Sequence, residues 1–410
     1  MTERMDALTT PSNWQKVRLG DIAEIKRGAS PRPIENPKWF CANSNVGWVR
    51  ISDISKNSRF LYKTAQKLSK KGIEKSRFIK QNSLIMSMCA TIGKPIITKI
   101  DTCIHDGFVV FENPKIDLNY LYYFLCYIEK EWLESGQQGS QVNLNVDLIK
   151  NKEVFYPKDL NEQIAIANIL SDVDHYLCSL DALILKKESV KKALRIKMLN
   201  QILASNGVEF RELGDIILSL KTGLNLRSFF KLNTPNANNY YVTIRELEDY
   251  TIKFTHQTDR IDDNALSLCL KRSNLEKDDI LFSGTGTIGK VSIIEKNPNN
   301  WAIKEGIYSI KPNKKIVFPR FLMFCLESSN IQNDIKNKSF GGIVKSIPMN
   351  DLQQIQIPLP PLNEQIAIAN ILSDLDHEII SLKNKKRQFD NIKKALNHDL
   401  MSAKIRILKK

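Results

Sequence analysis

The sequence offers little for disulfide, metal or membrane chemistry. Its seven cysteines are an odd number and include no CxxC pair, and its five histidines are scattered over 410 residues. These features support neither a disulfide framework nor a zinc site, and we expect no bound metal. No apolar run approaches the roughly 20 residues that a membrane span needs. The start, MTERMDALTT, lacks the apolar stretch of a signal peptide, so we expect a cytoplasmic protein.

Positive charge is what the chain has in excess. Lys and Arg number 60 against 45 Asp and Glu, which gives a formal net charge of +15. The hydrophobic fraction of 42% and the charged fraction of 26% are ordinary for a globular protein, and they exclude a chain that is fibrous or disordered throughout. The excess of cations suggests a polyanion partner, most simply nucleic acid.

An internal repeat dominates the sequence. Residues 160–175 and 362–377 are identical at fifteen of sixteen positions, 202 residues apart, and differ only at Val173 against Leu375. The segments before the two copies align loosely, and both contain the string TIGK. The chain therefore divides into four parts, in the order variable, constant, variable, constant: 1–159, 160–204, 205–361 and 362–410.

The two constant units are typical of long helices. Their apolar residues recur at alternating spacings of three and four, the pattern of a coiled-coil seam. Asn161 and Asn363 are good N-cap residues, and lysines such as Lys191 and Lys393 interrupt the seam. Two matching helices in one chain would most simply pack on each other, antiparallel if a pseudo-twofold axis relates the two halves.

The two variable units predict compact domains. Short β-rich runs such as SLIMSM, PIITKI, GFVVF, DILFSG and VSIIE alternate with turn residues, and the aromatic run YLYYFLCYI indicates a helix. Each unit is long enough to have its own core. The predicted fold class is α+β: two globular α/β domains separated by two long antiparallel helices that form a coiled coil, with a pseudo-twofold internal repeat.

This organisation indicates a function. A surface that occurs twice can bind the same partner twice, whereas divergent units on a constant frame can bind two different things at a fixed distance. Together with the basic charge, this favours a protein that reads two short DNA sequences separated by a fixed spacer. The paired helices would set that distance.

The same residues resemble those of a known family, the specificity subunits of type I restriction-modification enzymes. The resemblance covers essentially the whole chain and is most specific in FYPKDLNEQIAIANILSD and IQIPLPPLNEQIAIANILSD, each of which leads into a long helix. An LGDI opening, a TIGK turn and a Gly-rich stretch before each helix also fit. Lys158 and Asp159 depart from the pattern, because Pro360 and Pro361 stand there in the second copy. We expect this to change only the entry angle of the helix.

The resemblance implies that the variable units are target-recognition domains and the constant units conserved helical regions. It implies recognition of an asymmetric bipartite target in double-stranded DNA, and a complex with two methyltransferase (modification) subunits and with restriction/translocase subunits. The specificity subunit itself would catalyse nothing, and S-adenosylmethionine, ATP and magnesium would be bound by the partner subunits. The expected subunit-binding residues begin the two helices: Glu162, Gln163, Glu364 and Gln365.

Cations, amides and the threonines of TIGK near predicted turns are the candidates for DNA contact, since such side chains can hold phosphates or read base edges. Those in the first unit are Arg27, Arg32, Arg50, Thr91, Lys94, Gln137, Gln138 and Gln141. Those in the second unit are Lys221, Asn225, Arg227, Arg245, Thr287, Lys290, Lys338 and Lys345. Because the TIGK string is shared, it suits contact with the DNA backbone better than sequence reading.

Two rival functions remain open. A stand-alone DNA methyltransferase or nuclease with a duplicated DNA-binding region needs a catalytic motif, and FSGTG at 282–286 resembles one but lacks an NPPY or DPPY partner. The overlapping GTGTIGK nearly forms a phosphate-binding loop, but Val291 follows where Ser or Thr is needed, and a strand is predicted there in place of a helix. The other rival is a coiled-coil scaffold that does not bind DNA.

Overall fold

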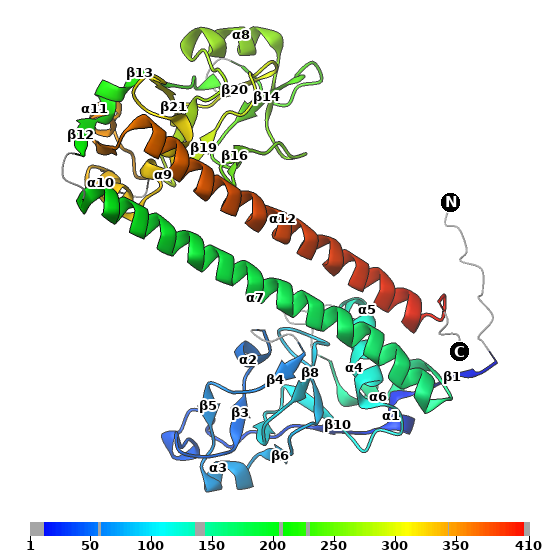
Figure 1. Ribbon diagram of the computed structural model, residues 1–410. Coiled ribbons are helices and arrows are strands. Elements are labelled where there is room, and N and C mark those ends of the chain that lie inside the picture. Colours follow the sequence, from blue (N-terminus) through cyan, green and yellow to red (C-terminus); the bar gives the residue numbers. More distant parts are fainter. Residues whose placement is uncertain are drawn as a thin grey trace. The chain divides into compact units, whose positions relative to one another are not determined.

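The structure is a computed structural model, which describes residues 12–55, 59–135, 144–204, 208–226, 230–342 and 344–405. The chain forms two compact units, one of residues 1–180 with 386–410 and the other of residues 181–385. Two long helices, α7 (Leu160–Ala204) and α12 (Leu362–Met401), each contribute a part to each unit (Figure 1).

The first unit contains a globular domain before α7. Its elements are β1 (Trp14–Arg18), α1 (Leu19–Ile22), β2 (Glu24–Arg27), η1 (Pro37–Trp39), β3 (Gly47–Val49), α2 (Ile51–Ser55), β4 (Phe60–Leu61), β5 (Gln66–Lys67), α3 (Lys70–Glu74), β6 (Arg77–Ile79), β7 (Leu84–Ser87), β8 (Pro95–Thr98), β9 (Thr102–Ile104), β10 (Phe108–Glu112), α4 (Leu118–Tyr127), α5 (Glu129–Ser135), α6 (Val146–Asn151) and β11 (Glu153–Pro157). The predicted strands at SLIMSM, PIITKI and GFVVF and the aromatic helix are all present.

Two sheets pack face to face in this domain. One has the strand order β2-β10-β7-β8-β4 and the other β5-β3-β9-β6. Alternate residues such as Ile85 and Val110 face Val49 and Ile104 of the other sheet in one buried cluster. The opposite face of the larger sheet packs on α4 and on the first turns of α7, where Leu170 is fully buried. Period-two burial thus joins the sheets, and the helix covers the remaining apolar face.

The second unit repeats this plan. Its elements are β12 (Glu209–Glu212), η2 (Leu213–Ile216), β13 (Ile217–Thr222), β14 (Asn239–Val242), β15 (Leu247–Glu248), β16 (Thr251–Ile252), β17 (Arg260–Ile261), α8 (Asp263–Arg272), β18 (Ile280–Ser283), β19 (Val291–Ile293), β20 (Trp301–Ile303), β21 (Ile307–Pro312), α9 (Pro319–Leu326), α10 (Ser329–Asn337), α11 (Met349–Gln353) and β22 (Gln356–Leu359). The larger sheet has the order β13-β21-β18-β19 and the smaller one β17-β14-β20.

Strand pairing confirms the internal repeat. In each domain the smaller sheet joins one parallel pair, β3 with β9 and β14 with β20, to an antiparallel edge strand, β5 or β17. Each domain is also closed by a ribbon that pairs its first strand with its last, β1 with β11 and β12 with β22. The second domain differs by an edge hairpin, β15 with β16, and by a longer helix α8 after the edge strand.

The long helices confirm the predicted antiparallel seam within each unit. In the first unit the start of α7 packs near the end of α12, where Tyr176 and Phe389 lie with ring centroids 4.5 Å apart. In the second unit the later part of α7 meets the start of α12, where Lys187 pairs with Glu378 at 2.8 Å. Opposite ends of the two helices therefore meet.

The predicted N-caps at Asn161 and Asn363 are wrong by two residues. Both helices begin one residue earlier, at Leu160 and Leu362, so the asparagines lie inside the first turn. The carboxylate of Asp159 accepts from the backbone N–H of Asn161 at 2.9 Å and caps the first helix. In the second copy Pro361 occupies this place, and its carbonyl accepts from the backbone of Gln365. The sequence departure noted at Asp159 thus changes how the helix is capped.

Among the residues that the structure describes, no helix is both long and apolar enough to cross a membrane. Within the same residues, no group of three or more His, Cys, Asp or Glu side chains is arranged to hold a metal ion.

Candidate nucleic-acid and subunit interface

In each domain a buried glutamine of the long helix forms hydrogen bonds with the backbone of the domain. The Gln163 amide donates to the carbonyl of Pro157 at 2.8 Å and accepts from the backbone N–H of Asp117, which caps α4. Gln365 makes the matching bonds, to the carbonyl of Pro360 and from the N–H of Phe318 at the start of α9. The two side chains are only 3% and 1% exposed, so they join domain to helix and are not part of the surface open to a partner subunit.

The other two predicted subunit-binding residues differ from each other. Glu162 accepts hydrogen bonds from the side chains of Asn13 (3.0 Å) and Trp14 (3.1 Å), so it helps to dock strand β1 on the helix. Glu364 is exposed. Of the four predicted residues, only Glu364 keeps a side chain free of bonds to the described part of its own domain.

The lysines that interrupt the seam find carboxylates on the opposite helix. Lys393 pairs with Asp174, and Lys191 pairs with Asp376. These are the same contact made twice, because the two lysines and the two aspartates are each 202 positions apart. The pairs also extend into the domains: Asp174 accepts from the Tyr123 hydroxyl at 2.7 Å.

In the second unit the ion pair of this network is more buried than in the first. Lys191 donates to the hydroxyl of Tyr250, which donates to Glu327 at 2.6 Å, and Glu327 pairs with Arg195 at 2.6 Å. Burial lowers the pKa of Lys191 despite the attraction of Asp376, and burial raises the pKa of Asp376 despite Lys191. Removal of one partner would leave the other charge buried and unpaired.

These pairs also decide the role of the Asp-His sequences in the repeat. Asp174 and Asp376 face lysines of the opposite helix, while the neighbouring His175 and His377 are exposed. The aspartates therefore do not orient the histidines in the way that an acid–base pair requires.

The TIGK strings form equivalent tight turns between strands, β7 to β8 and β18 to β19. In each turn a serine hydroxyl closes the loop, Ser87 to the carbonyl of Thr91 and Ser283 to the carbonyl of Thr287 at 2.6 Å. The glycine has a positive φ, +77° at Gly93. A strand follows each turn where a phosphate-binding loop requires a helix, so the resemblance to such a loop is coincidental.

The lysines of the two turns differ. The Lys290 ammonium lies 3.4 Å from the backbone carbonyls of Ile244 and Leu247, which hold it against its own domain. Lys94 is half-buried. Burial raises the pKa of Glu129, and the positive charge of Lys94 opposes this rise. A phosphate contact by the shared turns stays a prediction, and the lysine of the second turn would have to leave its carbonyls to make one.

In the first domain the structure brings two predicted arginines together around Asp106, which sequence reasoning missed. Arg27 donates from Nε to the Asp106 carbonyl at 2.7 Å, and Arg32 pairs with the carboxylate at 2.8 Å. Burial opposes ionisation of Asp106, but the hydroxyl of Ser30 and the charge of Arg32 outweigh it and lower its pKa. Arg50 lies partly exposed after β3, where Asp53 accepts from its backbone N–H.

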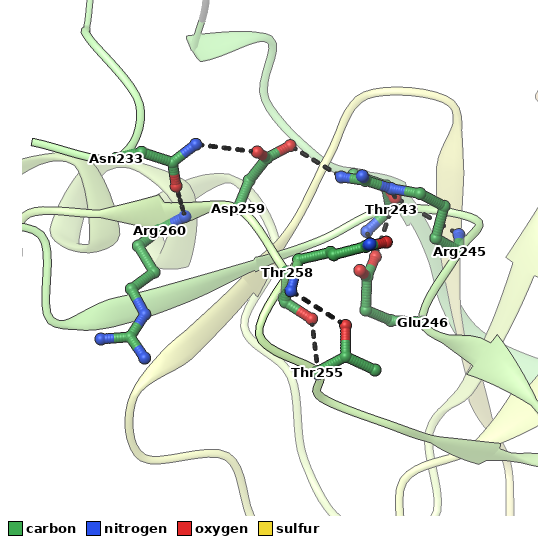
Figure 2. A network of polar contacts seen from close by, with 9 residues as sticks. Asn233, Thr243, Arg245, Glu246, Thr255, Thr258, Asp259 and Arg260 are labelled. Atoms are coloured by element: carbon green, nitrogen blue, oxygen red, sulfur yellow. Dashed lines mark hydrogen bonds and ion pairs between the residues drawn. The ribbon is translucent and has the colours of Figure 1, made fainter. Parts of the chain in front are cut away.

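In the second domain Arg245 is held by Asp259 at 3.0 Å, as Figure 2 shows. Lys221 is exposed on β13. Asn225 follows Gly223, where the backbone packs closely against the carbonyl of Ile303. Lys338 donates to Gln354 at 3.3 Å. Lys345 is exposed, and its carbonyl accepts from the backbone of Gly286. The candidates Gln137, Gln138, Gln141 and Arg227 lie outside the described residues.

The first turns of α7 and α12 carry a set of exposed side chains that is the same in both copies. We call this set the shared helix surface. It consists of Leu160, Asn161, Ile164, Asn168, Ile169, Asp172 and His175, and of Leu362, Asn363, Ile366, Asn370, Ile371, Asp374 and His377. Ile164 and Ile366 are each 37% exposed. The chain thus presents the same apolar and polar groups twice on equivalent helix turns.

The chain has two domains of the same fold, each attached to one of the paired helices and each with its own set of cations. These features define a class of protein in which one recognition domain occurs twice. The chain belongs to the type I restriction modification DNA specificity domain family, whose pattern matches residues 11–187 and again 206–389. It is therefore a DNA-specificity protein of type I restriction-modification, as the sequence predicted.

Two named relatives match this chain over nearly its full length, and a third matches over a shorter stretch. A protein provisionally named the MjaX type I restriction enzyme specificity subunit, from Methanocaldococcus jannaschii, is 27% identical, with 97% of this chain and 95% of the relative covered. The MjaVIII specificity subunit of the same organism is 24% identical, with 99% and 96% covered. The EcoBI specificity subunit of Escherichia coli is 30% identical over a shorter stretch, 33% of this chain and 26% of the relative.

Solved structures show the same fold. The S subunit of a type I restriction-modification system from M. genitalium matches with a TM-score of 0.61 at 16% identity, and 97% of this chain and 98% of that chain are covered. A chain from a study of complex assembly and conformational transition of the type I system matches with a TM-score of 0.55 at 15% identity, with 96% and 99% covered. At these identities the likeness concerns the fold alone.

Proposed function

We propose that this chain recognises an asymmetric bipartite sequence in double-stranded DNA, one part with each domain, and recruits two methyltransferase subunits through its helices. The shared helix surface is the observation that carries this proposal. Exposed residues are not constrained by the chain's own core, so a repeated exposed set that includes isoleucines suits two contacts with one kind of partner. Restriction/translocase subunits would join this assembly for cleavage.

The stoichiometry of the complex tests the recruitment. The mass of the purified complex should correspond to two methyltransferase copies for each specificity chain. Ile164→Asp should remove one copy, and Ile164→Asp with Ile366→Asp should remove both, because a carboxylate would be buried in each contact. Leu185→Asp is the matched control, since Leu185 is an exposed residue of α7 outside the shared helix surface. A wild-type complex with one copy would contradict the proposal.

The DNA side of the proposal is supported by the charge of the first domain. Residues 63–80, KTAQKLSKKGIEKSRFIK, span β5, α3 and β6 and contain six lysines and one arginine against a single glutamate. All six lysines are exposed, and none pairs with a carboxylate in the described part of the chain. Binding of duplex DNA should therefore weaken steeply with salt, because phosphate neutralisation releases counterions. Affinity that does not respond to salt in a gel-shift series would contradict this contact.

Catalysis and cofactor binding are assigned by this proposal to the partner subunits, which would hold S-adenosylmethionine, ATP and magnesium. The FSGTG segment supports the assignment because it has a structural use: a Cβ on Gly284 would lie 2.3 Å from the ring of Tyr308. Incubation of the purified chain alone with duplex DNA and labelled S-adenosylmethionine should transfer no methyl group. Transfer by the chain alone would establish the stand-alone methyltransferase in its place.

A further inference from the structure

The edge strands β5 and β17 place a cation at the same position in both domains. In the first domain Lys67 lies opposite Gly47 across the antiparallel pair, and in the second Arg260 lies opposite Tyr240. The neighbouring parallel pairs fix the correspondence, because Gly47 and Tyr240 each precede by two residues the buried valine that ends their strand. Neither cation was a sequence-based candidate.

The backbone around Arg260 is held unusually firmly for an exposed position. Its N–H donates to the side chain of Asn233 at 2.8 Å, and its carbonyl accepts from the Asn233 N–H at 2.9 Å. Asp259 then accepts from the Asn233 amide and from Arg245, each at 3.0 Å. Figure 2 shows this network and shows the Arg260 side chain directed away from it. The network therefore fixes the strand and leaves the guanidinium outside.

An aromatic ring orients the guanidinium. Its central carbon lies 5.3 Å from the ring centroid of Tyr240, which stacks on Phe254 at 4.5 Å. Within the described residues no carboxylate pairs with Arg260. A guanidinium stacked on a ring keeps its N–H groups free in a fixed plane, so less side-chain entropy is lost when it accepts a partner.

Lys67 has different surroundings at the same position. It faces a glycine, no aromatic ring among the described residues stacks on it, and it is flanked by the lysines of α3. The equivalent stretch in the second domain, residues 256–273, has three Lys or Arg residues against three acidic residues. The position is thus shared, but its chemistry differs. In the first domain it holds a flexible lysine in a basic segment, and in the second it holds an oriented guanidinium in a neutral segment.

We propose that this edge-strand position contacts DNA in both domains, Arg260 through a base edge and Lys67 through phosphate. The proposal rests on the proposed function. An oriented guanidinium matches the two acceptors that guanine presents in the major groove, whereas a lysine among lysines neutralises phosphates whatever the sequence. A position that is common to both domains but differs in its residue is what a pair of domains with different targets requires.

Selection from a duplex library with randomised positions tests the assignment, with the full-length chain in its methyltransferase complex. Arg260→Lys and Arg260→Gln should each reduce the preference for the selected duplex over mixed-sequence duplex by about tenfold. Arg260→Lys should keep the salt dependence of wild type. Arg272→Gln is the matched control: it removes the same charge from the exposed last turn of α8 and should leave the preference within about twofold of wild type.

Lys67 has a different expected signature. Lys67→Gln should weaken binding to all duplexes alike and lower the slope of log affinity against log salt by about one, and Lys67→Arg should restore both.

An Arg260→Lys complex with wild-type preference, or an Arg260→Gln complex equal to Arg272→Gln, would overturn the assignment of Arg260. A wild-type complex that prefers no duplex would instead overturn the proposed function, so the two failures are distinguishable.

Discussion

Single residues in this fold are constrained mostly by contacts that the sequence does not reveal. The TIGK string was readable as a turn, because Gly beside a polar residue between two β-rich runs is a turn signal. Its tightness was not readable, because it depends on Trp132, almost forty positions away. The Cβ of any residue at Gly93 would lie 2.3 Å from the Trp132 ring. The glycine is therefore needed for two reasons, its positive φ and its close contact.

A pair of glycine substitutions separates these reasons. Gly286 has a φ of +82° and no atom within 4 Å of an added Cβ, so Gly286→Ala should lower the free energy of unfolding by only about 1–2 kcal/mol, the backbone cost. Gly93→Ala should cost about 3 kcal/mol or more, because the ring must also move. Urea denaturation of both variants measures the difference. Equal losses would show that the Trp132 contact is unimportant.

The pH dependence of the free energy of unfolding should reveal the raised pKa of one buried carboxyl group. Asp279 is 2% exposed, and burial raises its pKa from the usual 3.8 to about 6, against the hydrogen bond from the Glu276 backbone and the charge of Lys311. A raised pKa in the folded state means that the folded chain binds the proton more tightly than the unfolded chain. The contribution of Asp279 to stability therefore falls as the pH rises from about 4 to about 6.

Asp279→Asn tests this directly, because the amide oxygen can still accept from Glu276. The free energy of unfolding of the variant relative to wild type should increase by about 2 kcal/mol between pH 4 and pH 7. Chemical denaturation at several pH values measures it. A difference that stays constant with pH would contradict the assignment.

At the scale of elements, the two long helices are matched by charge as well as by apolar packing. The apolar spacing predicted the seam, but the lysines within it looked like defects. They are not, because the antiparallel arrangement places each opposite an aspartate of the partner helix. A sequence pattern on one helix cannot show this, since the partner's register is needed. For the same reason the burial of Gln163 and Gln365 could not be read from the repeat.

The two pairs should differ in how strongly stability depends on them. The side chains of Lys191 and Asp376 are 8% and 12% exposed, against 31% and 18% for Lys393 and Asp174. Lys191→Met should destabilise the chain by about 3–5 kcal/mol, since Asp376 remains buried and unpaired, and Lys393→Met should cost less.

The double variant Lys191→Met with Asp376→Leu provides the control, because it removes both charges. It should recover most of the stability that Lys191→Met loses, as measured by urea denaturation. If the double variant were as unstable as the single one, the loss would come from packing, and the charge pair would not explain it.

At the scale of the whole molecule, the sequence alone predicted the α+β fold class, the two long helices that pack together and the internal repeat. It succeeded because the repeat is long and the strands are strongly apolar. It missed Asp106, which holds Arg27 and Arg32, and it missed the proposed DNA-contact position of Lys67 and Arg260. Strands β5 and β17 have only two residues each, too short for a periodic signal. Their edge positions emerge only from pairing with strands distant in the sequence.

In the proposed function, each domain reads its own part of the target independently of the other. Replacement of residues 205–361 by the equivalent region of a relative tests it most directly, with methylated positions mapped in a host genome that carries the altered system. One half of the bipartite target should change while the other half stays the same. A change in both halves would contradict it.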